Sequence, residues 1–325
     1  MQYRVLGKTS LKISEIGYGT WGLGGDSYGP VDDSNSIRCL RKAFDLGINF
    51  FDTSDLYGSG HSEEIIGQAF NSSRSDVIIA TKVGLLPHSG FYMPQDLSSE
   101  YIKKAIDSSL QRLKTDYVDL YQLHSPEVDY LINHPEVFRT LDELRQDGKI
   151  RHIGLSARSP KDALMLLNLY PFESVQVNFN LIDHRALDDG LFDKANSDNI
   201  GIIARTPLCF GYLSGTLSGK KDFVGQDHRS NWPEEQLQRW AKAPGLFNSL
   251  IERRKCTPAQ FALAYCLSHN AVSTTVPGMM NSKDITENLA VASMSILKQS
   301  EIDEIKKIYL ENTFYDPNAK LNGRQ

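Results

Sequence analysis

The chain has 325 residues, of which 40% are hydrophobic and 23% are charged, and its formal net charge is -5. This is an ordinary globular composition, long enough for one large α/β barrel or two smaller domains. The slightly negative charge and the mixing of acidic with basic residues give no electrostatic reason to expect a nucleic-acid partner.

Targeting signals and metal motifs are absent from the sequence. The first residues lack the apolar stretch of a secretory signal, and no apolar run reaches the length of a membrane span. The eight histidines show no HExxH spacing, and the four cysteines form no CxxC pair. We therefore expect a cytoplasmic protein with reduced thiols and no metal site, neither membrane-bound nor bound to nucleic acid. The cysteines are Cys39, Cys209, Cys256 and Cys266.

The first predicted element is a hairpin over Tyr3–Ser14, turning at Gly7. After it, short β-rich runs alternate with amphipathic helical segments, which is the pattern of a parallel α/β fold. Several runs are continuously apolar, as in strands that are buried on both faces. The predicted strands are Glu15–Trp21, Asn49–Ser54, Asp76–Val83, Tyr117–His124, Ile150–Ala157, Ser174–Asn180, Gly201–Leu208 and Ala271–Pro277.

Helices are predicted between these strands. A segment from Arg38 carries apolar residues at helical spacing and ends before Gly47, which is the expected C-cap. Ser62 is the expected N-cap of a second helix, with two glutamates in its first turn. Ser98–Thr115 places its apolar residues on one stripe, which is typical of a helix packed on a sheet.

Eight strand–helix units without a linker predict a (β/α)₈ TIM barrel, with an N-terminal β-hairpin and extra C-terminal helical segments, formed as a single domain by residues 1–325. The longest irregular stretch, Ser214–Pro233, is predicted to be a lid or binding loop. We expect the polar tail after Tyr309 either to be loosely ordered or to lie across the barrel mouth.

Four chemically active side chains fall where the second to fourth strands end. Asp52 and Tyr57 follow the second strand, Lys82 ends the third, and His124 ends the fourth. Each alone has an ordinary structural explanation as a cap, an ion pair or a packed ring. In a parallel barrel, however, the carboxyl ends of the strands meet around one pocket, so the combination predicts a site.

The sequence resembles the aldo-keto reductase superfamily over nearly its whole length, with the motifs in family order. The resemblance implies an NAD(P)-dependent oxidoreductase that reduces an aldehyde or ketone to the alcohol by direct hydride transfer. The substrate would be a small carbonyl or alcohol compound, such as a sugar or a sugar-derived carbonyl. The matching segments are Phe51–Gly58, Gly60–Gly67, Ala80–Val83, Val118–His124, Ile153–Ser156, Gln176–Asn180, Val276–Gly278 and Glu287–Leu289.

The family's catalytic tetrad falls on Asp52, Tyr57, Lys82 and His124. Tyr57 would be the proton donor, and Asp52 would keep Lys82 charged and oriented. An ammonium about 4 Å from the phenol would favour its ionised form by ~4 kcal/mol at an effective dielectric near 20, lowering the pKa of Tyr57. His124 would polarise the carbonyl by donating a hydrogen bond.

Cofactor positions are also implied by the resemblance. Ser156 and Gln176 would hydrogen-bond the nicotinamide amide, although Ala157 stands where the family often has Asn. Arg205 would stack on the nicotinamide ring, or else would only pair with a carboxylate at the strand end. The remaining positions expected to face nicotinamide or the phosphates are Thr20, Trp21, Asp52, Thr206, Pro207, Leu208, Gly211 and Lys220.

The loop expected at the adenosine end departs from the family pattern. Many NADP-using relatives carry Arg or Lys where Met280 or Asp284 stands, and neither of these can pair with a 2′-phosphate; Lys283 is the remaining partner. NADP(H) is the favoured cofactor and NAD(H) the alternative. The positions expected to contact the adenosine half are Gly278, Met280, Asp284, Glu287 and Asn288.

The substrate would contact Tyr57 and His124. Trp21 and Tyr28, after the first strand, would form a pocket wall or pack at the barrel rim. Two other functions stay open: an NAD-linked sugar or alcohol dehydrogenase, and a nucleotide-bound regulatory subunit of potassium channels. The sequence identifies neither the substrate nor the oligomeric state.

Overall fold

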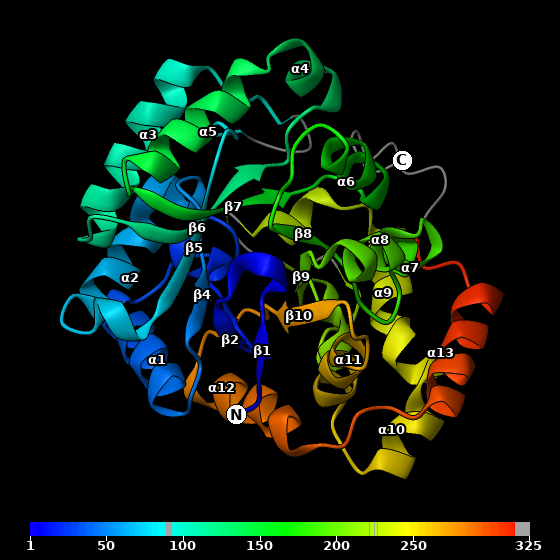
Figure 1. Cartoon of the computed structure of the whole chain (residues 1–325). Helices are drawn as coiled ribbons and strands as arrows, with labels where there is room; N and C mark the ends of the chain where they lie inside the picture. Colours follow the sequence, from blue (N-terminus) through cyan, green and yellow to red (C-terminus); the bar gives the residue numbers. More distant parts are fainter. Residues whose placement is uncertain (89–92, 221, 224, 226, 316–325) are drawn as a thin grey trace.

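The computed structural model describes residues 1–88, 93–220, 222–223, 225 and 227–315. Eight parallel strands form one curved sheet in chain order, and helices lie outside it (Figure 1). Each strand falls inside a predicted strand, although the first is much shorter than expected. The strands are β3 (Tyr18–Gly19), β4 (Phe50–Asp52), β5 (Ile78–Val83), β6 (Val118–His124), β7 (Ile150–Ser156), β8 (Ser174–Asn178), β9 (Gly201–Arg205) and β10 (Val272–Thr275).

The sheet closes on itself between its first and last strands. Ile16 bridges Thr275 and Gly19 bridges Gly278, both in parallel orientation. The amide of Gly19 donates to Pro277 O at 3.0 Å, and a Cβ at Gly19 would lie 2.6 Å from Val276 O. Only glycine therefore allows this close approach. The predicted (β/α)₈ barrel is confirmed.

Helices follow every strand, as the right-handed crossovers of a parallel sheet require. Most lie against the outer face of the barrel, and α9, α10 and α13 form an additional group on one side (Figure 1). The helices are α1 (Asp33–Asp45), α2 (His61–Phe70), α3 (Ser99–Leu113), α4 (Val128–Asn133), α5 (Glu136–Gln146), α6 (Pro160–Leu167), α7 (Arg185–Asp188), α8 (Leu191–Asp198), α9 (Glu234–Leu246), α10 (Asn248–Arg254), α11 (Pro258–Leu267), α12 (Ser282–Leu289) and α13 (Gln299–Glu311).

The barrel interior changes from apolar to polar along the strands. Leu120 packs with Phe50, Ala80 and Ile203 in an inner cluster. Successive side chains of a strand point to opposite faces, so Gln122 and His124 lie on the same inner face of β6 as Leu120. Hydrophobic residues fill the lower interior, and polar residues occupy the carboxyl ends of the strands.

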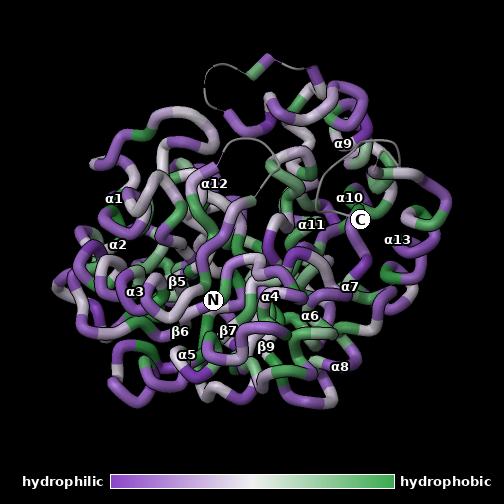
Figure 2. The backbone as a smooth tube through the Cα atoms, turned by 90° about the horizontal axis from the view of Figure 1, so that it is seen from above, coloured by the Kyte–Doolittle hydropathy of each residue, from purple (hydrophilic) through white to green (hydrophobic). Residues whose placement is uncertain are grey.

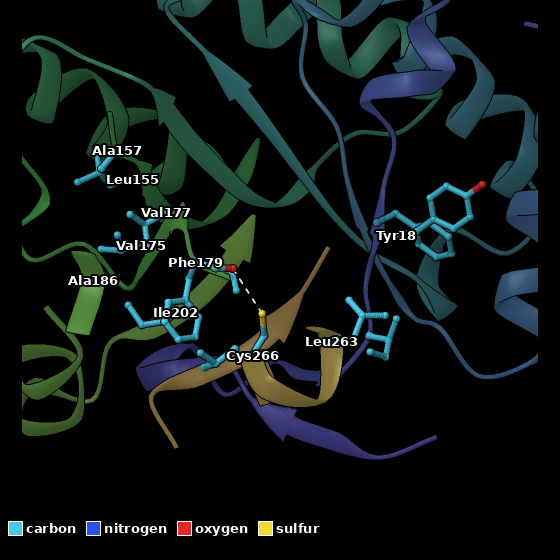
Figure 3. Close-up of a cluster of buried hydrophobic side chains, with 14 of the residues drawn as sticks. Tyr18, Leu155, Ala157, Val175, Val177, Phe179, Ala186, Ile202, Leu263 and Cys266 are labelled. Carbon is cyan, nitrogen blue, oxygen red and sulfur yellow. Dashed lines mark hydrogen bonds between the residues drawn. The ribbon is translucent and has the colours of Figure 1, made fainter. Parts of the chain in front are cut away.

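The outer face of the sheet packs against the helices. The tube in Figure 2 is hydrophobic mostly in the interior of the molecule and hydrophilic at its periphery. Figure 3 shows Val175, Val177 and Ile202 with Phe179 and Cys266, and the thiol of Cys266 donates to Phe179 O at 3.4 Å. This buried layer between sheet and helices stabilises the barrel from outside, at roughly 25 cal/mol per Å² of apolar surface buried.

The predicted N-terminal hairpin is confirmed and closes the lower end of the barrel. β1 (Tyr3–Val5) pairs antiparallel with β2 (Lys12–Ser14). The Arg4 side chain donates to Val272 O at 2.7 Å and to Leu267 O at 2.8 Å. The hairpin is therefore tied to the start of β10, which leaves the opposite, polar end as the mouth.

Two predicted helix boundaries need correction. α2 begins at His61 with Gly60 as its N-cap (φ 97°), so the prediction of Ser62 as N-cap is wrong. The hydroxyl of Ser62 instead donates to Thr20 Oγ1 at 2.7 Å, a tertiary contact that the sequence pattern does not reveal. At the end of α1 the C-cap is Leu46, and Gly47 follows it with a φ of 99°.

The predicted binding loop and tail lie only partly within the described residues. Ser214–Pro233 contains a short 3₁₀ turn at His228–Asn231, and residues 221, 224 and 226 of this loop lie outside the described part. α13 continues past Tyr309 to Glu311, and Phe314 is buried, whereas residues 316–325 lie outside the described part. The lid and the position of the tail stay predictions.

The described residues contain no helix with the length and apolar character of a membrane span. Nor do they bring three or more His, Cys, Asp or Glu side chains into an arrangement that could hold a metal ion.

Candidate active site

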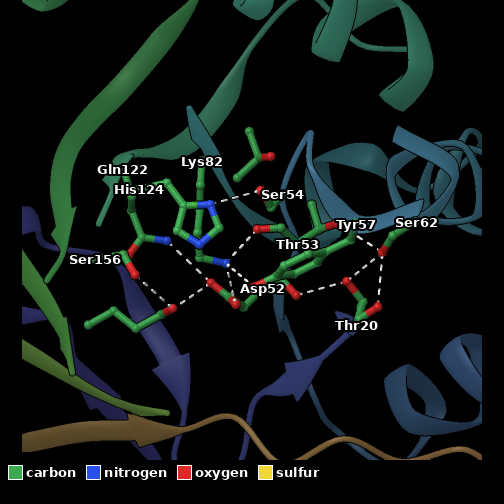
Figure 4. A network of polar contacts seen from close by, with 12 residues as sticks. Thr20, Asp52, Thr53, Ser54, Tyr57, Ser62, Lys82, Gln122, His124 and Ser156 are labelled. Atoms are coloured by element: carbon green, nitrogen blue, oxygen red, sulfur yellow. Dashed lines mark hydrogen bonds and ion pairs between the residues drawn. The ribbon is translucent and has the colours of Figure 1, made fainter. Parts of the chain in front are cut away.

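The structure brings the four predicted catalytic residues together at the barrel mouth (Figure 4). Asp52 ends β4, Lys82 lies one residue before the end of β5, and His124 ends β6. Tyr57 is the first residue of a 3₁₀ turn, Tyr57–Gly60, that follows β4. Because the neighbouring strands are parallel, their carboxyl ends lie at the same end of the barrel, where these side chains converge.

The fully buried ammonium of Lys82 connects the other polar groups. Its Nζ donates to Asp52 Oδ1 at 2.7 Å, to Thr53 O at 2.6 Å and to Tyr57 Oη at 3.2 Å. Burial alone would lower the pKa of Lys82, but Asp52 and Tyr57 outweigh that effect, and its pKa is raised. Lys82 therefore remains charged beside the phenol.

Asp52 is held from both sides. Its Oδ2 accepts hydrogen bonds from Gln176 Nε2 at 2.7 Å and from Gln122 Nε2 at 3.2 Å, while its Oδ1 accepts from Lys82. Sequence reasoning missed Gln122. Its position two residues before His124 on one strand could have identified it, because residues i and i+2 share a face.

The phenol of Tyr57 has a raised pKa, contrary to the expected lowering. Burial raises the pKa of Tyr57, and the opposing effect of Lys82 does not overcome it. A phenol that is buried away from water is costly to ionise, and this cost exceeds the attraction between phenolate and ammonium that the sequence predicted to dominate. Tyr57 is therefore protonated at neutral pH and accepts, through Oη, the hydrogen bond from Lys82.

His124 is neutral. Burial lowers the pKa of its imidazole well below the ordinary value, and the positive charges of Lys82 and Arg205 act in the same direction. Its Nδ1 lies 3.2 Å from Ser54 Oγ. The second ring nitrogen, Nε2, is drawn on the side of Lys82 and Tyr57 in Figure 4. Sequence reasoning missed Ser54.

Close backbone contact between two loops positions Tyr57. Gly58 has a φ of 60°, and a Cβ there would lie 2.2 Å from Gly24 O. Its amide donates to Asp26 Oδ2 at 3.0 Å. Thr20 lies under the same loops, where its hydroxyl donates to Asp52 O at 2.9 Å. These contacts explain the glycines that the sequence places after the first and second strands.

Polar groups also converge at the ends of β7, β8 and β9. Ser156 Oγ lies 3.4 Å from Gln176 Oε1, both side chains are buried, and Gln176 contacts Asp52. Arg205 donates from Nη2 to Ala157 O at 2.9 Å. The structure thus brings the positions predicted for the nicotinamide end together.

The backbone after β9 takes an unusual path. Thr206, Cys209 and Phe210 have φ values of 51°, 45° and 57°, and Gly211 has a φ of 96°. Pro207 is buried and Leu208 half-buried in this turn, whereas Lys220, predicted to reach a phosphate, lies exposed further along the chain. Non-glycine residues rarely adopt positive φ, so this run of strained residues marks a turn of defined shape.

The loop predicted for the adenosine end lies against the first loop of the barrel. Gly278 bridges Gly19, and a Cβ at Gly22 would lie 2.6 Å from Met280 Sδ. Asp284 Oδ2 accepts from the Met280 amide at 3.1 Å and from Asn281 Nδ2 at 3.0 Å. The Asp284 carboxylate therefore stabilises the loop.

The two remaining predicted adenosine positions lie further along α12. Glu287 is half-buried, and its carbonyl accepts from Gln260 Nε2 at 3.1 Å. Asn288 is buried.

An aromatic group borders the cluster. The Trp21 ring lies 5.4 Å from Tyr28, 6.4 Å from Tyr57 and 4.4 Å from His228, measured between centroids. Trp21 and Tyr28 therefore pack with each other at the rim and also adjoin Tyr57. His228 comes from the long loop after β9, so sequence reasoning could not place it here.

Comparison with known proteins identifies one family. A sequence model described as "Aldo/keto reductase family" matches residues 15–310. Aldo-keto reductase YhdN of Bacillus subtilis (strain 168) is 31% identical over 323 residues, covering 98% of this chain and 96% of that protein. L-galactose dehydrogenase of Arabidopsis thaliana is 32% identical over 302 residues, covering 90% and 88%.

A solved structure is also similar to this chain in fold and in sequence. The glycerol dehydrogenase AKR11B4 from Gluconobacter oxydans is similar with a TM-score of 0.80 and 30% identity, covering 97% of each chain. The similarity thus extends over all the strands that carry the polar cluster.

Proposed function

Since the chain belongs to the Aldo/keto reductase family, we propose that Asp52, Tyr57, Lys82 and His124 are the active-site residues with which it works. The protein is an NAD(P)-dependent oxidoreductase that reduces an aldehyde or ketone to the alcohol. The observation that carries the assignment of residues is the Lys82 ammonium, which joins Asp52 to Tyr57 through hydrogen bonds of 2.7 Å and 3.2 Å.

The residues at the ends of β7–β9 fit a nicotinamide cofactor. Ser156 and Gln176 together offer hydroxyl and amide groups to a carboxamide, although Gln176 already donates one hydrogen bond to Asp52. The left-handed run that ends at Gly211 resembles the concave backbone arrangements that bind anionic groups, which supports a pyrophosphate site there. When bound, the cofactor supplies hydride to the carbonyl carbon or accepts it from the alcohol.

The chain's own residues manage the proton. As the carbonyl carbon gains hydride, its oxygen gains negative charge and takes the Tyr57 proton. Tyr57 can donate because its Oη accepts from Lys82, so its own O–H is left for the ligand. The Lys82 ammonium then stabilises the phenolate until solvent returns a proton. In the oxidative direction Tyr57 is the base.

His124 orients the substrate oxygen. A neutral imidazole with Nδ1 bound to Ser54 presents Nε2 to the mouth. As an N–H donor, Nε2 polarises a carbonyl in the manner of an oxyanion-hole group. Trp21 and Tyr28 are proposed to bound the substrate pocket, and a sugar or sugar-derived carbonyl is the proposed substrate class. The dehydrogenase names of two similar proteins support both that class and the reverse direction.

NADP(H) is the proposed cofactor, and NAD(H) is the alternative. Lys283 supplies an exposed positive charge at the start of α12, where the helix dipole also favours an anion. Asp284 opposes a 2′-phosphate, although its carboxylate is engaged by Met280 and Asn281. We also propose one domain over the whole chain and a cytoplasmic location, which the four free cysteines support.

The proton-donor role predicts the behaviour of Tyr57→Phe. Because the phenyl ring keeps the shape but lacks the O–H, carbonyl reduction should fall about 10²-fold or more, while cofactor affinity stays nearly unchanged. Steady-state kinetics and fluorescence titration measure the two quantities. Tyr117→Phe, at the residue before β6 and so at the end of that strand opposite His124, is the matched control and should retain activity. Wild-type rates in Tyr57→Phe would refute the assignment.

A further inference from the structure

Ser54 lies between His124 and a carboxyl group that the proposed mechanism does not use. Ser54 Oγ lies 3.2 Å from His124 Nδ1 and 3.1 Å from Asp55 Oδ1. The amide of Leu56 donates to the same oxygen at 3.1 Å. Figure 4 shows the contact between Ser54 and His124 beside Lys82 and Tyr57. Asp55 is thus one hydroxyl away from the imidazole.

The protons can be arranged in two ways along the hydrogen-bonded row Asp55–Ser54–His124. A hydroxyl has one proton to donate and two lone pairs. If the carboxyl of Asp55 is ionised, Ser54 donates to it, and His124 must then donate from Nδ1–H. If the carboxyl is protonated, it donates to Ser54, which donates to His124 Nδ1. In both arrangements Leu56 N–H also donates to Ser54, so every group is satisfied.

The two arrangements give His124 opposite tautomers. A neutral imidazole carries one N–H, so a proton on Nδ1 leaves Nε2 as an acceptor, and an acceptor at Nδ1 leaves Nε2–H as a donor. We propose that Asp55 is a positioning residue that selects, through the Ser54 hydroxyl, whether His124 presents a donor or an acceptor to the substrate oxygen. This inference rests on the proposed role of His124.

The surroundings of Asp55 favour a change of state near neutral pH. Burial raises the pKa of Asp55 to about 7, and the nearby Glu63 carboxylate adds to that effect. The hydrogen bond from Ser54, the charge of Arg112 and the Leu56 amide act in the opposite direction, but Glu63 already pairs with Arg112 at 2.7 Å.

The other titratable groups near Asp55 stay neutral in this range. The charge of Asp55 acts on Tyr101 of α3 and Tyr121 of β6, and the pKa of each phenol is raised mainly by its burial, which is partial for Tyr101 and complete for Tyr121. On the other side of Ser54, the pKa of His124 is held well below its ordinary value by burial, with Lys82, Arg205 and His88 adding to that effect. The change near pH 7 therefore belongs to the Asp55 carboxyl.

The consequence concerns the rate of the reaction. A carbonyl oxygen accepts hydrogen bonds only, so reduction needs Nε2–H and hence protonated Asp55. An alcohol has one O–H proton, and an alcohol that donates it to a bare Nε2 cannot give it to Tyr57, the base of the oxidative direction, so ionised Asp55 disfavours oxidation as well. The contribution of His124 to both directions should therefore weaken as pH rises through about 7, the pKa of Asp55.

The test observes the tautomer directly in the full-length protein labelled with ¹⁵N-histidine. The two ring nitrogens of His124, assigned by comparison with His124→Gln, should exchange protonated and unprotonated signals as pH passes through about 7, the pKa of Asp55. In Asp55→Asn the amide donates to Ser54 at every pH, so His124 should stay protonated on Nε2. The pH step should also disappear in Ser54→Ala.

The matched control is Asp45→Asn, which removes an exposed carboxylate from α1 and should leave the pH step unchanged. One constant tautomer in the wild type, or the wild-type step persisting in Asp55→Asn, would overturn the proposal. If a variant fails to fold, the titration of the wild type still tests the proposal, because a single tautomer at every pH would overturn it. Because the signal needs no turnover, failure of the proposed function would show separately, as the absence of carbonyl reduction by the wild type.

Discussion

Lys82 combines a structural and a chemical role at one residue. It is fully buried, and its ammonium donates to Asp52, Thr53 and Tyr57. A buried charge is tolerated only when it is paired and hydrogen-bonded. Asp52 is the partner that pairs with the Lys82 ammonium, and Gln122 and Gln176 donate hydrogen bonds to the other oxygen of the Asp52 carboxylate. The cluster is therefore preorganised before any ligand arrives.

This arrangement predicts that Lys82→Met destabilises the fold as well as abolishing activity. Removing one partner of a buried pair leaves the Asp52 carboxylate uncompensated, which typically costs about 3–5 kcal/mol. Because two amides still donate to Asp52, we expect the lower end, about 3 kcal/mol, in denaturant unfolding. Lys104→Met, on the exposed face of α3, is the control. Wild-type stability of Lys82→Met would show that the pair is energetically neutral.

Three of the four catalytic residues that the sequence predicts share one property. Asp52, Lys82 and His124 lie at strand ends, and strand ends follow from apolar runs in the sequence. Gln122 follows from the same strand by alternation. Ser54 and His228 do not, because their contacts depend on how loops fold over the mouth, and local patterns do not encode that. The raised pKa of Tyr57 also required knowledge of its burial.

At the scale of elements, the strands were predictable and the loops were not. Continuous apolar runs located all eight strands, but the start of α2 was misplaced because Ser62 serves a tertiary contact with Thr20. The loop before α12 likewise depends on contacts that local sequence patterns do not reveal. The sequence predicts Asp284 at the adenosine end of the cofactor, but no local pattern predicts that its carboxylate also accepts from the Met280 amide and Asn281 Nδ2.

Asp284 therefore gives a prediction for cofactor choice. Asp284→Arg replaces a repelling charge with an attracting one, so affinity for NADPH should rise relative to NADH by roughly tenfold, the equivalent of one modest ion pair. Asp284→Asn keeps an acceptor for the Met280 amide, and it separates loss of charge from loss of loop contacts. Fluorescence titration with each cofactor measures the ratio. Equal changes for both would mean that this loop does not contact the 2′-position.

At the scale of the whole molecule, closure of the barrel creates the site. The bridges between Gly19 and Gly278 and between Ile16 and Thr275 join the ends of the sheet. The hairpin closes the lower end, with Leu6 and Ile13 packed beneath Phe50. The barrel mouth is thus the face where polar side chains meet, and the order of strands alone brings residues from β4, β5 and β6 together.

The most direct test of the central claim follows the hydride. Wild-type protein is incubated with glyceraldehyde or another small aldehyde and with NADPH or NADH that carries deuterium at the transferable position. The account predicts an alcohol with deuterium on the former carbonyl carbon, formed far more slowly by Tyr57→Phe. An alcohol without deuterium, or no alcohol from any aldehyde or ketone with either cofactor, would contradict direct hydride transfer at this site.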